Sequence, residues 1–362
     1  MWQECELEKL TRTALSKDDR GKSLKLFSRY EAFRDSLCRH IFEDISRTQP
    51  DLTRHGISHI QAVMKNALDL LGEDVHELSP MELYCLSLSI LFHDVGNIKE
   101  RKGHQQCIPE IYNEVIGSLS ADAQERRLIS AIGAAHCGVT SNGSKDTLGA
   151  LSVDAEPLFR GPVRQQIMAA ILRFADELDE GPERTSVYLL KEDKFSDESW
   201  VYHEYARSTH VLVDRPGARI VLTYNINIPA INAGRLAPKD KKRLRKLLSK
   251  VGERIIKLDE ERQYAKHYCD YLKNFKLTSV AFNFCLDGDG IDLDVPKLNI
   301  PDTVLTPGKS PKDIASHGTE YAPDDLIVRI EKILAERTNK KATIKSKSDG
   351  LLGAIRNIFK KG

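Results

Sequence analysis

The sequence lacks several features that would place it quickly in a class of protein. Its seven cysteines are widely spaced and form no C-x-x-C pair, so we expect neither a disulfide framework nor a cysteine zinc site. Reduced thiols in a cytoplasmic protein are the simpler interpretation. No apolar run approaches the ~18 residues of a membrane-spanning helix. The first ten residues, MWQECELEKL, also lack the apolar stretch of a signal peptide.

Three familiar motifs are missing as well. Gly21-Lys22-Ser23 and Gly308-Lys309-Ser310 end like a phosphate-binding loop, but neither has a glycine five residues earlier. The stretch beginning at Asp287, D-G-D-G, lacks the glycine that an EF-hand loop has at its sixth position. No G-x-S-x-G occurs. These stretches are therefore interpreted as turns.

A strong charge of one sign is also absent, because the net charge of the 362 residues is only +1. The whole molecule therefore has no strong attraction to nucleic acid or to an anionic membrane. The charge is uneven, however: residues 337–362 hold eight Lys/Arg and one acid, so this tail carries +7 and the first 336 residues carry −6. A near-neutral body argues against a long nucleic-acid groove, which would need a basic stripe.

Apolar residues at three-four spacing predict helices in the first half of the chain, over 23–45, 59–73, 81–93, 124–136 and 162–178. We therefore expect a helical domain over residues 1–190. After Arg184 the pattern changes, since HVLVDRPGARIVLTYNINI at 210–228 predicts two strands around a turn. A helix of about 35 residues from Lys239 and a second hairpin follow.

The second half is therefore expected to hold a small α+β domain over 195–296, a proline-rich linker over 297–322, and a helix with a basic tail over 323–362. The last residues, GLLGAIRNIFKKG at 350–362, form an apolar stripe with basic residues elsewhere. Two interpretations stay open: weak contact with an anionic membrane, or a helix docked on its own core or on a partner subunit. The second is favoured, because short amphipathic helices usually pack on protein.

The pair His93-Asp94 closes a strongly apolar helix, where polar side chains are costly unless something requires them. Imidazole and carboxylate are ligands for divalent transition metals. Adjacent helical residues point about 100° apart, but Gly96 just after the pair is expected to end the helix and let them converge.

A metal site needs more ligands, and the helical half offers His59, His104, His136 and Asp176 at helix ends or on apolar faces. Each has a simpler explanation when it is taken alone. A histidine on an apolar face is more often a hydrogen-bonded core residue, and Asp176 could pair with Arg173 or Arg184. The joint pattern favours the metal site.

Three stretches carry a resemblance to a known family: SHIQAV at 58–63, ILFHDVGN at 90–97 and ILRFADELD at 171–179. With His59, His93-Asp94 and Asp176 in order, the chain resembles the HD superfamily of metal-dependent phosphohydrolases over residues ~50–185. The resemblance implies a helical HD-type domain, and together with the pattern of the second half the predicted fold class is mainly α: this domain, a small α+β domain and a basic C-terminal tail.

The resemblance also implies a ligand set for one or two divalent ions, with Mn, Fe, Mg, Zn, Ni and Co not distinguished. His59, His93, Asp94 and Asp176 would hold the first ion, and His104 and His136 the second, with Asp94 bridging the two. The implied reaction is hydrolysis of a nucleotide-type phosphoester or phosphoanhydride by a metal-bound hydroxide.

Around the ligands, Asp94, Arg101 and Arg173 are the predicted catalytic residues, the two arginines because their planar fork binds phosphate. His55 is expected beside the ligands or facing substrate, and Asp179 is expected to hold a ligand histidine or to pair with Arg184. The expected substrate is a small nucleotide, with homo-oligomer or partner contacts through the α+β domain. The alternative function is a nucleotide-binding regulatory or partner-binding module without turnover.

Overall fold

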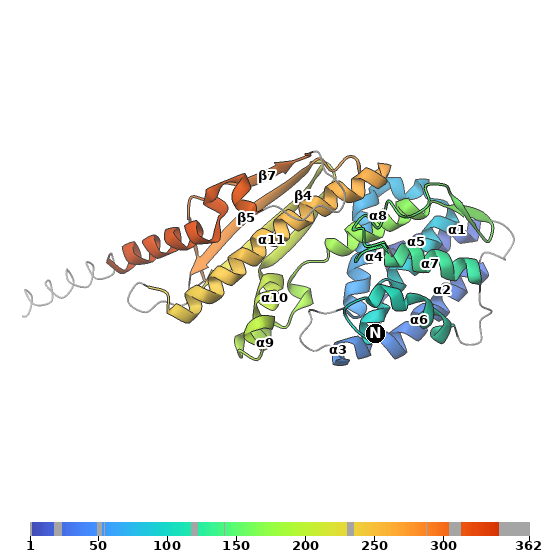
Figure 1. Cartoon of the computed structure of the whole chain (residues 1–362), viewed down its shortest axis with the longest axis horizontal. Coiled ribbons are helices and arrows are strands. Elements are labelled where there is room, and N and C mark those ends of the chain that lie inside the picture. The colour runs from blue at the N-terminus through green and yellow to red at the C-terminus, as the bar shows by residue number, and fades with distance from the viewer. Residues whose placement is uncertain are drawn as a thin grey trace, which may run out of the picture.

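A computed structural model of the chain describes residues 2–17, 24–48, 53, 55–116, 122–140, 142–229, 235–286, 288–303 and 313–339. Figure 1 shows a helical part at the right and a sheet-bearing part at the left, joined by the long helix α11. The predicted fold class, mainly α with a following α+β part, is confirmed. Among the helices of these ranges, none combines the length and apolar character that crossing a bilayer requires.

The helical part consists of α1 (Glu6–Lys17), α2 (Leu24–Leu37), α3 (Glu43–Thr48), α4 (Ile57–Leu71), α5 (Pro80–Phe92), α6 (Ile108–Val115), α7 (Ala123–Ala134) and α8 (Gln165–Glu177). Helix α5 is central: every residue from Met81 to Phe92 is buried, and α1, α4, α7 and α8 pack around it. Its start is fixed by a capping box, in which Ser79 and Glu82 each bond the other's backbone N–H.

Among the helix boundaries that the pattern misplaced, one coincides with a strand. The predicted helix over 162–178 begins only at Gln165, because Gly161–Val163 form strand β2, paired antiparallel with β1 (Glu156–Leu158). Pro162 explains the difference, since the residue before a proline is driven towards an extended backbone. The short helices α9 (Val187–Lys191) and α10 (Asp197–Ser208) then lead towards the sheet.

The sheet contains β3 (Thr209–Asp214), β4 (Arg219–Ile228), β5 (Leu277–Leu286), β6 (Asp289–Ile291) and β7 (Leu298–Pro301). The predicted hairpin β3–β4 is confirmed, as is the pairing of β5 with β6. β4 and β5 are parallel, so α11 serves as the crossover between them. β7 pairs antiparallel with β5, and the prediction that a linker starts at residue 297 is therefore wrong for its first residues. Because β7 is an edge strand, the sheet tolerates Pro301 there.

Helix α11 (Pro238–Tyr268) is 31 residues long and lies along the sheet (Figure 1). Its C-terminal half also packs against α8 of the helical part. A further helix over 323–339 packs beside the start of α11, where Glu331 pairs with Lys241 at 2.9 Å. The amphipathic segment predicted at 350–362 lies outside the described residues.

Candidate metal centre

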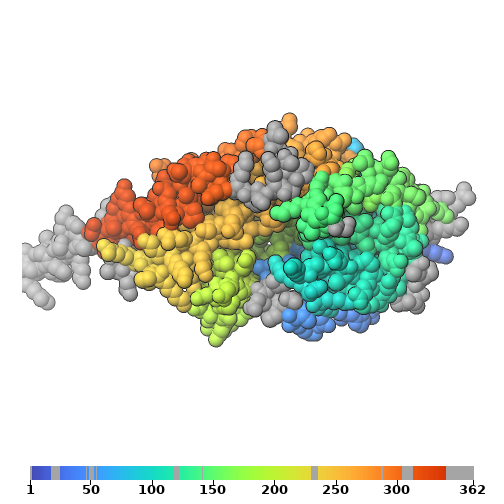
Figure 2. Space-filling model, in the orientation of Figure 1, coloured from blue at the N-terminus to red at the C-terminus, as the bar shows by residue number. Residues whose placement is uncertain are grey.

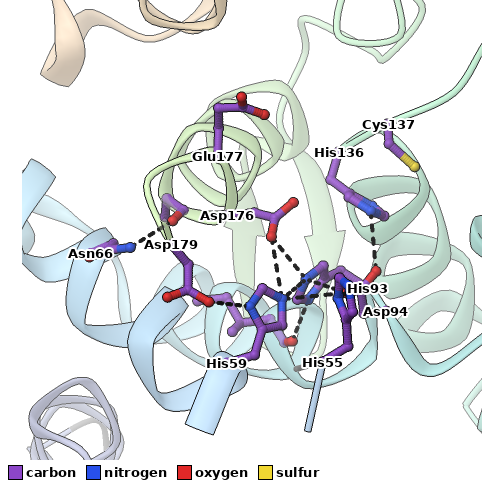
Figure 3. Close-up of polar contacts among 12 residues, drawn as sticks. His55, His59, Asn66, His93, Asp94, His136, Cys137, Asp176, Glu177 and Asp179 are labelled. Atoms are coloured by element: carbon purple, nitrogen blue, oxygen red, sulfur yellow. Dashed lines mark hydrogen bonds and ion pairs between the residues drawn. The ribbon is translucent and has the colours of Figure 1, made fainter. Parts of the chain in front are cut away.

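The six predicted ligands come from five separate places in the helical part and meet in one cluster (Figure 3). His59 lies in the first turn of α4, His93 and Asp94 end α5, His104 opens the turn His104–Cys107, His136 follows α7, and Asp176 lies in the last turn of α8. We call these six residues the donor cluster.

The backbone leaves the helix between His93 and Asp94. His93 keeps helical angles (φ −57°, ψ −37°), whereas Asp94 has φ −109° and ψ 2°, so the two side chains can point to the same place. The expected role of Gly96 as the cap is wrong, because His93 itself caps α5. A Cβ at Gly96 would lie 1.9 Å from the carbonyl oxygen of His104, so the glycine is needed for the close approach of the His104 turn.

Four side chains form the first group of donor atoms. The Nε2 of His59 lies 3.4 Å from Asp94 Oδ2, 3.4 Å from Asp176 Oδ1 and 3.2 Å from His93 Nε2. The Nε2 of His93 lies 3.7 Å from Asp94 Oδ2 and 3.6 Å from Asp176 Oδ1. Ligands at about 2.1 Å from a tetrahedral ion are about 3.4 Å apart, so these atoms have the spacing of a coordination shell.

The second group uses the other oxygen of Asp94. Its Oδ1 lies 3.1 Å from His104 Nε2 and 3.6 Å from His136 Nε2, and the two nitrogens are 3.2 Å apart. Asp94 thus presents one oxygen to each group, which is the arrangement of a bridging carboxylate. The division of ligands between the groups is the one that the family resemblance implied.

Outer hydrogen bonds fix the orientation of all four imidazoles. Each ring has an acceptor at Nδ1: Asp179 Oδ2 at 2.6 Å for His59, Ile90 O at 2.8 Å for His93, Arg101 O at 2.9 Å for His104 and Gly133 O at 2.6 Å for His136. In a neutral imidazole, an acceptor at Nδ1 places the proton there and leaves the Nε2 lone pair facing the cluster. Metal-binding histidines are held in this way in proteins generally.

The electrostatics of the cluster favour a cation. Burial acts to raise the pKa of Asp94, but the imidazoles of His93, His104 and His136 hold it far below its ordinary value. Burial likewise acts to lower the pKa of His59, yet hydrogen bonds to Asp179 and Asp94 raise it to about 9. The buried carboxylate of Asp94 and the partly exposed carboxylate of Asp176 therefore favour protons on the neighbouring imidazoles, and a divalent ion could replace those protons.

Comparison with known proteins supports this interpretation. Residues 49–228, just under half of the chain, match the family model HD-CE. The match indicates an HD-type domain over this segment. All six residues of the donor cluster lie within it. Neither the comparison with curated proteins nor the comparison with solved structures gave a match.

Two further residues of this segment hydrogen-bond to members of the donor cluster. His55 Nδ1 lies 2.9 Å from Asp94 Oδ2, and burial together with the charge of Arg184 lowers the pKa of His55 to about 4. A neutral His55 therefore hydrogen-bonds Asp94. Asp179 accepts from His59 and lies 3.6 Å from Arg184 Nε, so it has both contacts that the sequence suggested for it.

The two predicted catalytic arginines of the HD-type domain have different environments. Arg101 is exposed beside the cluster and lines a cleft. Arg173 is mostly buried and makes a two-pronged ion pair with Glu261 of α11, at 2.6 and 2.7 Å. It also donates to Ala135 O at 3.1 Å and to Thr147 Oγ1 at 2.9 Å. These contacts join α8 to its neighbours and leave the Arg173 fork largely occupied.

The cleft has a volume of about 410 Å³ and reaches beyond the donor cluster to the sheet-bearing part. Figure 2 shows the surface hollowed between the helical part and α10. Tyr202 and Tyr205 from α10, and Lys250, Arg254 and Lys257 from α11, line it together with Asp94, His104, His136 and Asp176. The sequence offered no motif for the α10 and α11 residues, because only the packing of α11 on α8 brings them here.

Cys137 lies beside the donor cluster, and the sequence analysis gave it no role. Its Sγ lies 3.7 Å from His104 Nε2, and Figure 3 shows the thiol beside the His136 ring. Burial acts to raise the pKa of this thiol, but His136 and His104 lower it to about 6. One signal was available: Cys137 follows a histidine at the end of a helix, as Asp94 follows His93.

Proposed function

We propose that the chain is a metal-dependent phosphohydrolase or phosphodiesterase acting on a nucleotide-type phosphoester or phosphoanhydride. One observation carries the proposal: Asp94 offers an oxygen to each of two groups of converging imidazole nitrogens. His59, His93, Asp94 and Asp176 would hold one ion, and Asp94, His104 and His136 a second. When bound, two such ions lower the pKa of a water and offset the negative charge of a phosphate.

The surrounding side chains would position the reactants. The neutral imidazole of His55 donates to Asp94 Oδ2 and so helps to hold one oxygen towards each group. Arg101, exposed at the cleft, offers a planar fork for two phosphate oxygens. Asn97, buried beside it, adds an uncharged amide to the same lining.

The sheet-bearing part would bind the rest of the substrate. The Tyr202 side chain is 50% exposed and offers an aromatic face to the cleft. Lys250 Nζ lies 4.8 Å from the centre of that ring, and burial lowers the pKa of its amine. An aromatic face with a cation beside it suits a base and a phosphate of one nucleotide, and the cleft volume is of the size that small ligands occupy.

The test begins with the metal content of the full chain, measured by elemental analysis for the wild type and for Asp94→Ala. A screen of nucleotide phosphoesters and phosphoanhydrides with Mn²⁺ follows. We expect bound divalent metal and turnover in the wild type, and loss of both in the variant. Metal and nucleotide binding without hydrolysis would replace the proposal with a regulatory module, and the absence of any bound metal would end it.

A further inference from the structure

We propose that Cys137 is a protein ligand of the second group, so that this position takes a thiophilic cation such as Zn²⁺, Fe²⁺ or Co²⁺ in preference to Mg²⁺. The inference rests on the metal-binding half of the proposed function and does not depend on turnover. It adds sulfur to a ligand set that the family resemblance limited to His104, His136 and Asp94.

The distances carry the assignment. Cys137 Sγ lies 3.7 Å from His104 Nε2, and the donor atoms of Cys137, His104 and His136 all lie within 4.8 Å of one another. With Zn–S near 2.3 Å and Zn–N near 2.1 Å, tetrahedral ligands are separated by about 3.6 Å. Asp94 Oδ1 lies 3.1 and 3.6 Å from the same two imidazole nitrogens, so the thiol and this carboxylate oxygen both lie beside the His104–His136 pair.

The backbone around Cys137 is shaped to bring it there. Helix α7 ends at Ala134, and Gly138 has φ +78°, a left-handed conformation that glycine adopts without strain. A Cβ at Gly138 would lie 2.4 Å from Gln105 Nε2, so the glycine also lets the Cys137 turn pack against the His104 turn. At Gly96 the close neighbour is the backbone of His104 itself, 1.9 Å from where a Cβ would lie. Both glycines thus allow close packing around the turn that carries His104.

The kind of donor atom gives the selectivity. The first group offers only nitrogen and oxygen, whereas the second would offer one sulfur, two nitrogens and one oxygen. Thiolate sulfur favours Zn²⁺ and iron, while Mg²⁺ requires oxygen ligands in near-ideal octahedral geometry. The two positions of the cluster are therefore chemically unequal, and Mg²⁺ alone should not fill the second.

Cobalt provides a spectroscopic test on the full-length protein, because thiolate bound to Co²⁺ gives a charge-transfer band in the near ultraviolet. We expect this band in the wild type loaded with Co²⁺ and its loss in Cys137→Ala. Cys285→Ala, which removes a partly buried thiol from strand β5, is the matched control and should keep the band. A wild type that lacks the band, or a band that survives in Cys137→Ala, overturns the assignment.

Alkylation gives a second measurement that needs no variant. Iodoacetamide should label Cys137 in the metal-free protein and in excess Mg²⁺, and the label should be lost in Zn²⁺, as mapped by mass spectrometry. Equal labelling of Cys137 in Zn²⁺ and Mg²⁺ would contradict the proposal. Because neither readout uses catalysis, the expected band without hydrolysis would sink only the proposed reaction. Hydrolysis by a Co²⁺-loaded protein without the band would sink only the Cys137 assignment.

Discussion

Two neighbouring carboxylates on α8 face opposite kinds of surroundings. Asp176 Oδ1 lies 3.4 Å from His59 and 3.6 Å from His93, inside the donor cluster. Glu177, the next residue, points away from those histidines in Figure 3 and pairs with Arg254 at 2.6 Å and Lys257 at 2.8 Å. The first carboxylate contacts imidazoles, and the second pairs with the permanent cations of α11.

The same contrast separates the two regions of the cleft. In the described part of the chain, neither Asp94 nor Asp176 has a lysine or arginine as a salt-bridge partner. The α8–α11 contact is instead paired throughout: Arg254 with Glu177 and Glu180, Lys257 with Glu177, and Arg173 with Glu261. We infer that these ion pairs with Arg and Lys hold α11 against α8, whereas the carboxylates of the donor cluster, which contact imidazoles, would bind a divalent cation.

The largest effect should come from Asp94→Ala, which removes the carboxylate shared by both groups. We expect loss of bound divalent metal and a fall in phosphohydrolase activity of about a thousandfold or more. Asp69→Ala removes a carboxylate from the surface of α4, where it pairs with Lys65, and should keep metal and activity. Elemental analysis and initial rates measure both. Full metal content in Asp94→Ala would show that Asp94 is not a ligand.

The next effect concerns stability. Arg254→Met leaves Glu177 and Glu180 mostly buried without this partner, and should lower the free energy of unfolding by about 3 kcal/mol. Arg245→Met, also on α11, breaks an exposed pair with Asp324. It should lower the free energy of unfolding by no more than about 1 kcal/mol. Urea unfolding of both variants measures the two losses of unfolding free energy. Equal losses would mean that the Arg254 pairs do not hold the two parts together.

The donor cluster was largely predictable from the sequence, whereas the α8–α11 contact was not. Each ligand stands in a local context that can be read in a few residues, such as the apolar run before His93 or the face of α8 that carries Asp176. The predicted role of Gly96 was wrong, because its close contact with the backbone of His104 arises from tertiary packing and leaves no local sequence signal.

The pairing of Arg173 with Glu261 spans 88 residues of chain, and no spacing rule connects them. Arg173 was therefore predicted to bind phosphate, although most of its fork contacts α11 and the segment after α7. The strand β7 could not be predicted from the sequence for a similar reason. Its pairing with β5 depends on a neighbour about 20 residues away, while the prolines of the stretch 297–322, Pro301 of β7 among them, suggested a linker.

A smaller effect is expected when the support of a ligand is removed. Asp179→Ala takes away the acceptor at His59 Nδ1, and should weaken metal binding by about 10- to 100-fold without abolishing turnover at saturating metal. Asp179→Asn, which keeps an oxygen acceptor, should recover part of the affinity. Metal titrations with an activity readout and a competing chelator separate the effect on metal affinity from the effect on turnover. Unchanged affinity in Asp179→Ala would mean that the cluster orients His59 without it.

The smallest effect is expected at Lys250, the cation of α11 that faces the cleft beside Tyr202 and whose pKa is lowered by burial. Lys250→Met should raise the KM for a nucleotide substrate by about tenfold, equivalent to about 1.4 kcal/mol, and leave kcat nearly unchanged. Lys246→Met, at an exposed position one turn earlier, is the control. Steady-state kinetics of the wild type and the two variants measures KM and kcat. If kcat falls instead of KM rising, Lys250 acts at the reacting phosphate, and the separation between a chemical region and a binding region of the cleft is wrong.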